Sequence, residues 1–386
     1  MAAGHLRAAT FIDRWDTNDV RVVSYNAYWN SPFAPSEDTD PTTPERFRRM
    51  MTALQPDVLA VQEMNAGSAV AMGLLLEQIM PLANGGRWSV HQRSDNVIAS
   101  RYPILSRSGS LGHADVLVDL PNDRFDSDLY VISDHWPCCS YETERQLEAD
   151  AMVNWIDRLK GPTSSLPDNT PLIVVGDLNI VGTQHPLNTL LTGNAVNSQI
   201  ADSAPDWDGT PLTSAAPLHN GVGPESYTWR DDSDIYDPGV LDYVVYTDSV
   251  LETANRFLLN TRSMSESDLA LTDLQADDVM TKASTGFYDH LPLVVDFRER
   301  PVVITGDYDR DGMIDEADYA TWAEQYGGVN APPADGNGDG VVNTADYTVW
   351  RDAYDASLAA TAVPEPCSLL LAAGIAIAGA SSPRRG

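Results

Sequence analysis

The sequence predicts a layered α/β domain over most of the chain, followed by smaller C-terminal segments. Between residues 21 and 298, short apolar runs typical of buried strands alternate with segments of helical periodicity. Hydrophobic residues make up 43% of the 386 residues, enough for a sizeable core. The pattern stops near residue 299, where ERPVVITG indicates a linker. Strands and helices mixed in this way favour a sheet core with helices outside it.

The elements are predicted in chain order from apolar periodicity and boundary residues. A strand over 21–29 precedes a loop rich in Pro, Ser and Asp, and then a helix over 44–54 that begins with proline. A second helix is predicted over 142–160, where large apolar residues recur at i, i+3, i+4 and i+7 from Met152. Further strands are predicted at 57–64, 87–105 (two strands), 128–136, 171–180, 241–246 and 291–297.

The charge balance bears on the choice of partner. The chain has 24 Lys and Arg against 56 Asp and Glu, a net charge of −32. Residues 1–300 hold 20 basic and 43 acidic residues, and the remainder hold 4 and 13. Neither part has the basic surface expected of a tight nucleic-acid binder. We interpret the acidity as a source of solubility.

Polar residues stand at or near the ends of several predicted strands. They are four acids, two amides and two imidazoles: Asn26, Glu63, His135, Asp177, Asn179, Asp242, Asp289 and His290. Each one alone is explained as a turn cap or a solvated side chain. Together they suit metal-assisted phosphoryl transfer, because Mg²⁺ takes oxygen ligands, donors stabilise a charged transition state, and a carboxylate or imidazole activates water. The spacing of two between Asp177 and Asn179 predicts that both side chains share one face of an extended strand.

Other hydrolase signatures are absent from the sequence. It contains no G-x-S-x-G turn of a serine hydrolase, no H-E-x-x-H zinc helix and no G-x-x-x-x-G-K phosphate loop. The strand-end residues are therefore the strongest candidates for chemistry.

Seven motifs resemble, in the same order, those of the endonuclease/exonuclease/phosphatase superfamily, which has the fold of pancreatic deoxyribonuclease. They are VVSYNAYW, DVLAVQEM, DNVIASRYPI, VISDHWP, VVGDLNI, LDYVVY and YDHLPLVVDF, within roughly residues 20–298. The resemblance implies a four-layered α/β sandwich of two packed sheets that cleaves phosphate esters with Mg²⁺ or Mn²⁺. It implies Glu63 as the main metal ligand, with Asn26 beside it and Asp289 near the metal or the water.

The resemblance also implies roles for the other candidate residues. Asp177 would orient or activate the attacking water, and Asn179 would hold a phosphoryl oxygen. His290 would contact the scissile phosphate, with Asp242 oriented against it. His135 resembles the family histidine that donates to the leaving side.

Two twelve-residue segments, 307–318 and 335–346, repeat one pattern at an offset of 28 residues. Each has oxygen-bearing side chains at positions 1, 3, 5 and 12 and glycine at position 6, a spacing typical of Ca²⁺ ligands. These side chains belong to Asp307, Asp309, Asp311, Asp318, Asp335, Asn337, Asp339 and Asp346. The alternative, an acidic disordered linker, does not account for two copies with matching glycines and aromatic residues. The pair resembles a dockerin type I module, which implies Ca²⁺ binding and a cohesin-like protein partner.

The last residues resemble a PEP-CTERM sorting tail. VPEP at 363–366 precedes 14 uncharged residues and a terminal Arg pair. At ~1.5 Å per residue this apolar run reaches only ~21 Å, short of a ~30 Å hydrocarbon core. The resemblance implies export, membrane engagement and processing, whereas residues 1–20 lack the apolar stretch of a signal peptide. The three cysteines suggest neither a disulfide framework nor a zinc site.

These observations divide the chain into six predicted segments. They are an N-terminal segment (1–20), the endonuclease/exonuclease/phosphatase domain (21–298), a linker (299–305), the dockerin-like module (306–353), a spacer (354–362) and the tail (363–386). The predicted function is an exported, metal-dependent phosphoric ester hydrolase at the cell surface or membrane. The alternative is a calcium-dependent docking or scaffold protein whose sandwich domain does not catalyse. The substrate stays open among nucleic acid, phospholipid head groups and small phosphate esters.

Overall fold

The computed structural model describes residues 10–34, 41–108, 112–232, 235–280, 289–300, 305–310, 312–329 and 332–361. The chain forms two compact units, Met1–Arg300 and Pro301–Gly386. The predicted sorting tail, 363–386, lies outside the described residues. Within the described part of the chain, none of the helices combines the length and apolarity needed to cross a bilayer.

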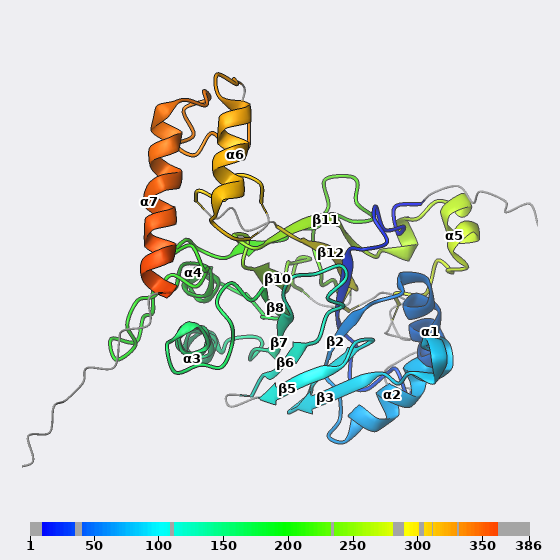
Figure 1. Ribbon diagram of the computed structural model, residues 1–386. Helices are drawn as coiled ribbons and strands as arrows, with labels where there is room; N and C mark the ends of the chain where they lie inside the picture. The colour runs from blue at the N-terminus through cyan, green and yellow to red at the C-terminus, as the bar shows by residue number, and fades with distance from the viewer. Residues whose placement is uncertain are drawn as a thin grey trace, which may run out of the picture. The chain divides into compact units, whose positions relative to one another are not determined.

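Two mixed six-stranded sheets form the centre of the first unit (Figure 1). The first sheet has the strand order β11–β12–β1–β2–β4–β3. Only β1 and β2 pair in parallel within it, and the other neighbours are antiparallel. Its strands are β1 (Val20–Asn26), β2 (Val58–Gln62), β3 (Ser89–Arg93), β4 (Asn96–Ser100), β11 (Leu251–Leu258) and β12 (Leu293–Glu299).

The second sheet has the order β5–β6–β7–β8–β10–β9. Here β7 and β8 are the parallel pair, and the remaining neighbours are antiparallel. Its strands are β5 (Ile104–Ser108), β6 (Ala114–Val118), β7 (Leu129–His135), β8 (Leu172–Asp177), β9 (Thr213–Ser214) and β10 (Asp242–Tyr246). The central strands of both sheets are buried along their length, as expected of strands covered on both faces.

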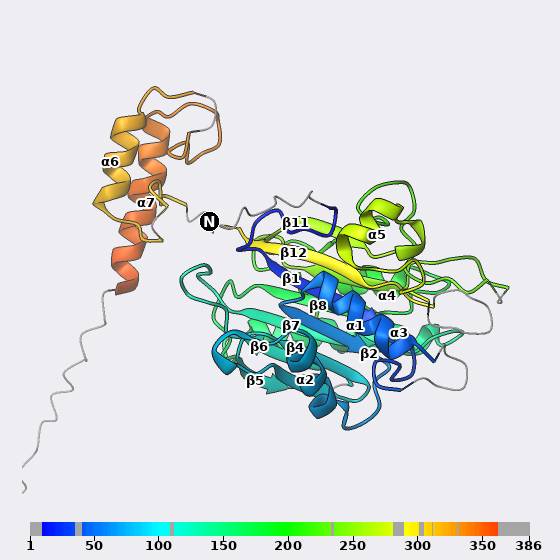
Figure 2. The ribbon, with the colours of Figure 1, turned by 90° about the vertical axis from the view of Figure 1, so that its right-hand side faces the viewer.

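Helices cover the outer face of each sheet, which gives four layers (Figures 1 and 2). Helices α1 (Thr43–Leu54) and α2 (Ser68–Ile79) pack against the first sheet, and α3 (Glu142–Lys160) and α4 (His185–Thr192) against the second. A short helix, α5 (Glu266–Thr272), follows β11. The α/β sandwich of two packed sheets that the sequence predicted is thus confirmed.

Side-chain alternation along β8 divides the core into two clusters. Ile173 and Val175 belong to the large cluster that includes residues of the first sheet, whereas Leu172 and Val174 pack with α3 and α4. A strand sends successive side chains to opposite faces, so Asp177 continues the row of Ile173 and Val175. The alternation therefore directs Asp177 toward the space between the two sheets.

Several sequence predictions agree with the observed elements and others do not. The helix predicted over 142–160 matches α3. The strand predicted over 21–29 is wrong at its end, because β1 stops at Asn26 and residues Tyr28–Asn30 form a left-handed turn. The sequence did not predict α2, α4, β6 and β11, nor the disulfide that joins the adjacent residues Cys138 and Cys139.

The second unit contains two helices related by the 28-residue repeat, α6 (Glu316–Gln325) and α7 (Thr344–Thr361). Trp322 of α6 donates its indole N–H to the backbone carbonyl of Asn343 at 2.9 Å. Trp350 of α7 donates in the same way to the carbonyl of Asp315, the N-cap of α6, at 3.0 Å. Each helix thus braces the start of the other. Helix α7 also continues past residue 353, the predicted end of the module.

Candidate active site

The candidate catalytic residues come together because strand alternation is the same in three neighbouring strands. Val131 of β7, Val175 of β8 and Val244 of β10 all belong to the core cluster between the sheets. His135, Asp177 and Asp242 lie an even number of residues from these valines, on the same face of the second sheet. The backbone register pairs Asp177 with His135 on one side and with Asp242 on the other. Three residues scattered over the sequence therefore form one row.

The centre of this site is the Oδ2 atom of Asp177. The side-chain amide of Asn26, at the end of β1, donates to it at 3.0 Å. The Nε2 atoms of His290 and His135 lie 3.5 and 3.7 Å from the same oxygen. Burial is the largest influence on Asp177 and raises its pKa to about 6; the positive charge of His290 opposes this effect, and the negative charge of Asp242 adds to it.

His290 is held by Asp242. Its Nδ1 atom lies 2.7 Å from Oδ2 of Asp242, and both side chains are buried. Burial alone would lower the pKa of His290, but the charges of Asp242 and Asp177 outweigh it and hold the pKa well above its usual value. The Thr228 hydroxyl accepts the backbone N–H of Asp242 at 2.9 Å and so positions the first residue of β10. Thr228 was not among the predicted site residues.

His135 has a partner that sequence reasoning missed. Its Nδ1 atom lies 2.7 Å from Oδ2 of Asp95, on the two-residue turn between β3 and β4. Burial disfavours the charged imidazole, yet the Asp95 hydrogen bond and the charges of Asp177, Asp95 and Glu63 raise the pKa of His135 to about 9. Asp95 stands in the motif DNVIASRYPI, so a signal was available, but an acid in a turn has an ordinary structural explanation.

Glu63 offers a carboxylate beside this group. It follows β2 directly and has a left-handed backbone, with φ 60°. Its Oε1 atom accepts the Asn26 amide at 3.0 Å, and its Oε2 atom accepts the backbone N–H of Trp29 at 3.0 Å. Asn26 therefore bridges Glu63 and Asp177 through one nitrogen. The half-buried Glu63 carboxylate is oriented by two donors and still has lone pairs for a cation.

Asn179 is buried near Asp177, but not by the geometry that the sequence predicted. Strand β8 ends at Asp177, and Asn179 has φ 47°. The prediction that the two side chains share one face of an extended strand is therefore wrong. Instead the backbone N–H of Asn179 donates to Oδ1 of Asp177 at 3.0 Å, closing a local turn. Its side-chain amide donates to the carbonyl of Trp136 at 2.9 Å, one residue beyond His135. The turn thus ties β8 to the end of β7.

Asp289 lies next to His290 and is also buried. Its Oδ1 atom accepts the indole N–H of Trp229 at 2.6 Å, and its charge is one of the influences that raise the pKa of His290. Trp229 pairs with His290 in an antiparallel bridge and was not predicted to belong to the site. All eight candidate residues of the first unit therefore lie at or next to strand ends of this one region.

Two aspartates and a histidine of the site lie close enough together to hold a metal ion. One ligand atom from each of Asp177, Asp242 and His290 lies within 4.8 Å of the others. However, Asp242 and His290 already share a hydrogen bond, and a cation there would have to displace that proton. Mg²⁺ prefers oxygen ligands, which Glu63 supplies without breaking a pair. Glu63 is therefore the better candidate for a hard cation.

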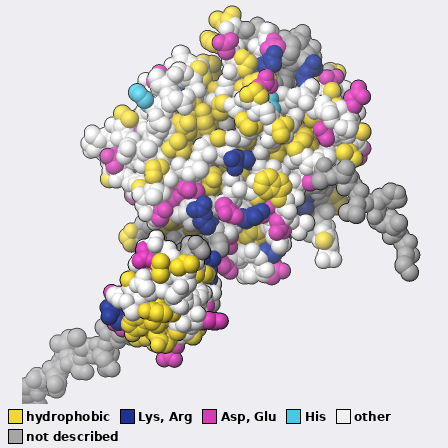
Figure 3. All heavy atoms as spheres, turned by 90° about the horizontal axis from the view of Figure 1, so that it is seen from above, with side chains coloured by type: hydrophobic (Ala, Val, Ile, Leu, Met, Phe, Trp, Pro, Cys, Tyr) yellow, Lys and Arg dark blue, Asp and Glu magenta, His cyan; other side chains and the backbone are white. Residues whose placement is uncertain are grey.

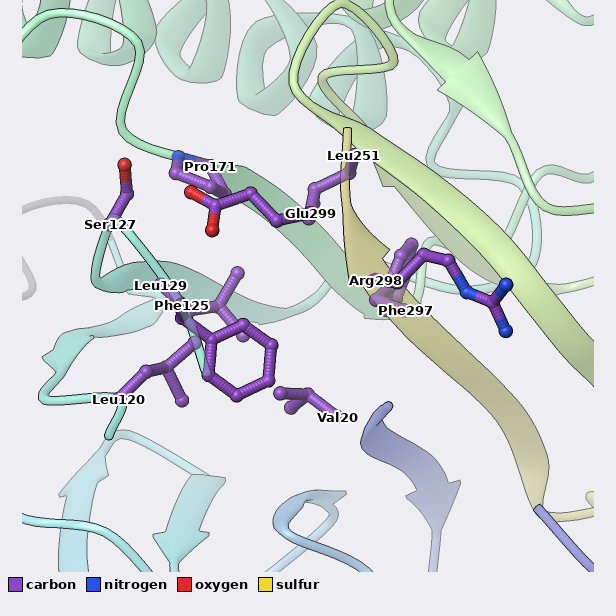
Figure 4. A pocket seen from close by; sticks show the side chains of 10 residues that line it. All are labelled: Val20, Leu120, Phe125, Ser127, Leu129, Pro171, Leu251, Phe297, Arg298 and Glu299. Carbon is purple, nitrogen blue, oxygen red and sulfur yellow. The ribbon is translucent and has the colours of Figure 1, made fainter. Parts of the chain in front are cut away.

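The pocket shown in Figure 4 lies elsewhere. It is lined by residues at the starts of β1, β7 and β11, including Val20, Leu129 and Leu251, with Phe125 against them. The candidate catalytic residues Asn26 and His135 lie at the opposite ends of β1 and β7. The pocket is apolar apart from a few side chains at its rim and lacks the polar cluster described above.

The repeated loops of the second unit hold their acids in matching ways. Asp318 is fully buried, and its Oδ1 atom accepts the backbone N–H groups of Tyr308 and Asp309 at 2.6 and 3.1 Å. Asp346, 28 residues on, is also fully buried and accepts the N–H of Asn337 at 3.1 Å. The last acid of each loop is thus turned inward.

The first acid of each loop also has a matching role. Asp307 and Asp335 accept the N–H of the loop glycine, at 3.0 and 2.8 Å respectively. Ligand atoms of Asp307, Asp309 and Asp318 lie within 4.8 Å of one another. In the second loop the Asn337 amide donates to the exposed Asp339 at 3.0 Å. Asp311, a predicted ligand, lies outside the described residues.

The chain was compared with curated protein sequences and with solved structures. No curated protein sequence matches the chain. Among solved structures, the human Nocturnin catalytic domain with bound sulfate is 15% identical, with a TM-score of 0.48, and the match covers 75% of this chain and 97% of that one. TDP2 of D. rerio, complexed with a single-strand DNA product, is 13% identical, with a TM-score of 0.44 and coverage of 73% and 100%.

A third similar structure is a mannosyl-6-phosphatase of Bacteroides thetaiotaomicron, which is 12% identical, with a TM-score of 0.43 and coverage of 72% of this chain and 99% of that one. The family model described as the endonuclease/exonuclease/phosphatase family matches residues 23–262. This match spans more than half of the chain and includes six of the eight candidate residues. The chain therefore belongs to the endonuclease/exonuclease/phosphatase family.

Proposed function

We propose that the first unit is a metal-dependent hydrolase of phosphodiester bonds. The observation that carries this proposal is the set of groups around Oδ2 of Asp177: one amide donor and two imidazoles of raised pKa. A buried carboxylate between two cationic donors suits a reaction in which water loses a proton while negative charge grows on phosphate oxygens.

The residues present fit a divalent cation. Glu63 would hold it, with Asp289 as a second carboxylate, because one or two carboxylates plus water suit Mg²⁺ or Mn²⁺. The two N–H donors to Glu63 fix the orientation of its carboxylate before any ion binds. When bound, the cation would supply positive charge that polarises a phosphoryl oxygen.

The side chains divide the remaining work. Asp177, with its pKa of about 6, is largely ionised at neutral pH and accepts the proton of the attacking water. His290, kept protonated by Asp242, donates a hydrogen bond to a nonbridging phosphate oxygen. His135, kept protonated by Asp95, donates on the leaving side. Asn26 orients Asp177 and Glu63 with one amide group.

The acidic charge of the first unit favours small phosphate esters, or esters whose organic part is uncharged, over long polyanions. Figure 3 shows one face of the molecule, on which basic and acidic side chains are interspersed instead of forming one basic patch. Polynucleotide binding gains most of its affinity from many basic contacts with phosphates. A short phosphate ester needs only the hydrogen-bond donors that are already present at the candidate site.

A substrate panel tests the proposal. The purified protein is assayed with bis(4-nitrophenyl) phosphate, DNA, RNA and sphingomyelin, with Mg²⁺, with Mn²⁺ and with a chelator. We expect turnover of at least one diester that chelation abolishes and added metal restores. Asp177→Asn keeps the shape but removes the charge, so it should lower kcat more than it raises KM. No turnover in any arm, or an Asp177→Asn variant with wild-type kcat, contradicts the proposal.

We further propose that the second unit is a dockerin-like calcium module, which gives a second candidate function, protein docking. The support is the paired geometry of the two loops and the reciprocal Trp322 and Trp350 hydrogen bonds. A cohesin-like protein would be the partner, and residues 363–386 would direct export and membrane association. Mass spectrometry of the protein from its native host tests the tail: an intact C-terminus on a protein outside the membrane fraction contradicts it.

A further inference from the structure

Trp29 stands on a turn whose backbone conformation is unfavourable for residues with side chains. Tyr28, Trp29 and Asn30 have φ values of 44°, 49° and 64°, three successive non-glycine residues in the left-handed region. Each Cβ there crowds the following carbonyl oxygen, so such runs persist only where surrounding contacts enforce them. Glycine would adopt this turn more easily. The presence of Tyr28, Trp29 and Asn30 in this turn, in place of glycine, therefore needs a structural or functional reason.

The contacts that enforce the turn come from the candidate active site itself. The backbone N–H of Tyr28 donates to Oδ1 of Asn26 at 3.2 Å, and that of Trp29 donates to Oε2 of Glu63 at 3.0 Å. The N–H of Asn30 donates to the backbone carbonyl of Glu63 at 3.0 Å. Asn26 and Glu63, two candidate residues of the site, thus also fix the backbone of the turn that carries Trp29.

Packing accounts for Asn30 but not for Trp29. The Asn30 side chain accepts the Ser68 hydroxyl at 2.9 Å and so anchors the turn to α2. Trp29 is 64% exposed, and among the described residues its ring makes no hydrogen bond and no aromatic or cation contact. A single exposed aromatic residue is ordinary on a protein surface. One whose backbone N–H donates to a candidate metal ligand, on a turn of unfavourable conformation, is not explained by the fold.

We propose that Trp29 is the platform of an aromatic subsite that binds the organic part of the substrate by stacking. The inference rests on the proposed function and deepens it, because it narrows the substrate class to phosphate esters with an aromatic ring close to the phosphate. A mononucleotide ester has this chemistry and avoids the repulsion that the acidic unit would exert on a long polyanion. Stacking on an aromatic side chain accepts any base, so the subsite selects for a ring more than for a sequence.

Two competitive inhibitors, one with an aromatic base and one with a hydroxyl in its place, test the subsite. Adenosine 5′-monophosphate and ribose 5-phosphate are titrated against hydrolysis of bis(4-nitrophenyl) phosphate with Mg²⁺. Wild-type protein should bind the nucleotide about 5-fold or more tightly than the sugar phosphate, which is the lower end of what one stacked base contributes. In Trp29→Ala this ratio should fall to about 1, while ribose 5-phosphate binds as before. Trp29→Phe keeps a ring and should retain most of the ratio.

The matched control is Trp15→Ala. Trp15 is 73% exposed and precedes β1, at the opposite end of that strand from the site, so its replacement should leave the ratio unchanged. Calorimetric binding of both inhibitors to each variant gives a second readout that needs no turnover. If the wild type hydrolyses no diester but shows the Trp29-dependent ratio by calorimetry, the proposed reaction fails and the subsite stands. Equal binding of both inhibitors to wild type, or parallel losses of both in Trp29→Ala, overturns the subsite.

Discussion

The Oδ2 atom of Asp242 lies 2.7 Å from the Nδ1 atom of His290, a contact that joins the first residue of β10 to a residue 48 positions later in the chain. The pair is buried, and Oδ1 of Asp242 has no hydrogen-bond partner among the described residues. A buried carboxylate oxygen without a hydrogen-bond partner costs free energy, so its presence in a folded protein asks for a reason. The charge of Asp242 raises the pKa of His290, and its Oδ2 contact turns the ring so that Nε2 lies 3.5 Å from Oδ2 of Asp177.

The first prediction concerns this pair. His290→Ala removes a donor to the transition state and should lower kcat by ~10²–10³-fold, as is typical for one preorganised group. Asp242→Asn leaves the imidazole in place but removes the charge that raises its pKa, so we expect a smaller loss of kcat with little change in KM. Steady-state kinetics with the best substrate of the panel measure both. The exposed Asp168, replaced by Asn, serves as the control and should match wild type.

The second prediction concerns the pH range of His135. In metal-free protein, Asp95→Asn should move the pKa of His135 down from about 9, because the replacement removes its hydrogen-bonding anion. The folded pKa of wild-type His135 lies above the ordinary value of 6.5, so the contact stabilises the fold below pH 6.5, and this contribution is lost as the pH rises through 9. Titration of the imidazole resonances by NMR measures the shift.

The same NMR titration includes a second histidine, His113, whose pKa serves as an internal reference. Burial lowers the pKa of His113, which contacts neither Asp95 nor His135, so its titration should be the same in both proteins. The difference in thermal stability between wild type and Asp95→Asn should shrink above pH 9. A His135 resonance that titrates identically in the two proteins would show that Asp95 does not control its charge.

The third prediction concerns a buried ion pair at the far end of the first sheet. Arg21 donates to both oxygens of Asp296 at 2.6 and 2.7 Å, and the two side chains are 2% and 0% exposed. Asp296→Ala leaves a buried cation unpaired and should lower the free energy of unfolding by about 3–5 kcal/mol in urea titrations. Asp277→Ala breaks the exposed pair with Arg262 and should cost only about 0–1 kcal/mol. Equal effects of the two replacements would contradict the argument.

The fourth prediction concerns calcium. Terbium, which takes the same oxygen ligands as Ca²⁺, should give tryptophan-sensitised luminescence with the full chain, because Trp322 and Trp350 lie beside the repeated loops. Added Ca²⁺ should compete the signal away. Asp318→Ala with Asp346→Ala removes the buried acid of both loops and should abolish the part of the signal that remains when excess Mg²⁺ occupies the first unit, while Asp352→Ala, an exposed acid of α7, should not. A signal that survives the double replacement would assign it to other acids.

Much of the fold could be predicted from the sequence, because buried strands and amphipathic helices leave strong local periodicity. Helix α3 has the bounds that its apolar spacing predicted, and the central strands β1, β2, β7, β8 and β10 were found with errors of a few residues. Helix α2 was missed although it is apolar, since it lacks the clear polar face that marks an amphipathic helix. Strand β6 was missed because Asp115 interrupts its short apolar run, so that no clear alternation marks it.

The sequence by itself determined which residue types are available to the site and that they stand at or near the ends of buried strands: Asn26, Glu63, His135, Asp177, Asp242 and His290. For the residues inside strands, such as His135, Asp177 and Asp242, strand alternation then dictates the face, since that is a local property of the backbone. Only the tertiary structure decided the partners, because they depend on strand order and turn geometry, which no local pattern encodes. The pairing of His135 with Asp95, the left-handed turn at Asn179 and the position of Trp29 against Glu63 all arise where separate segments meet.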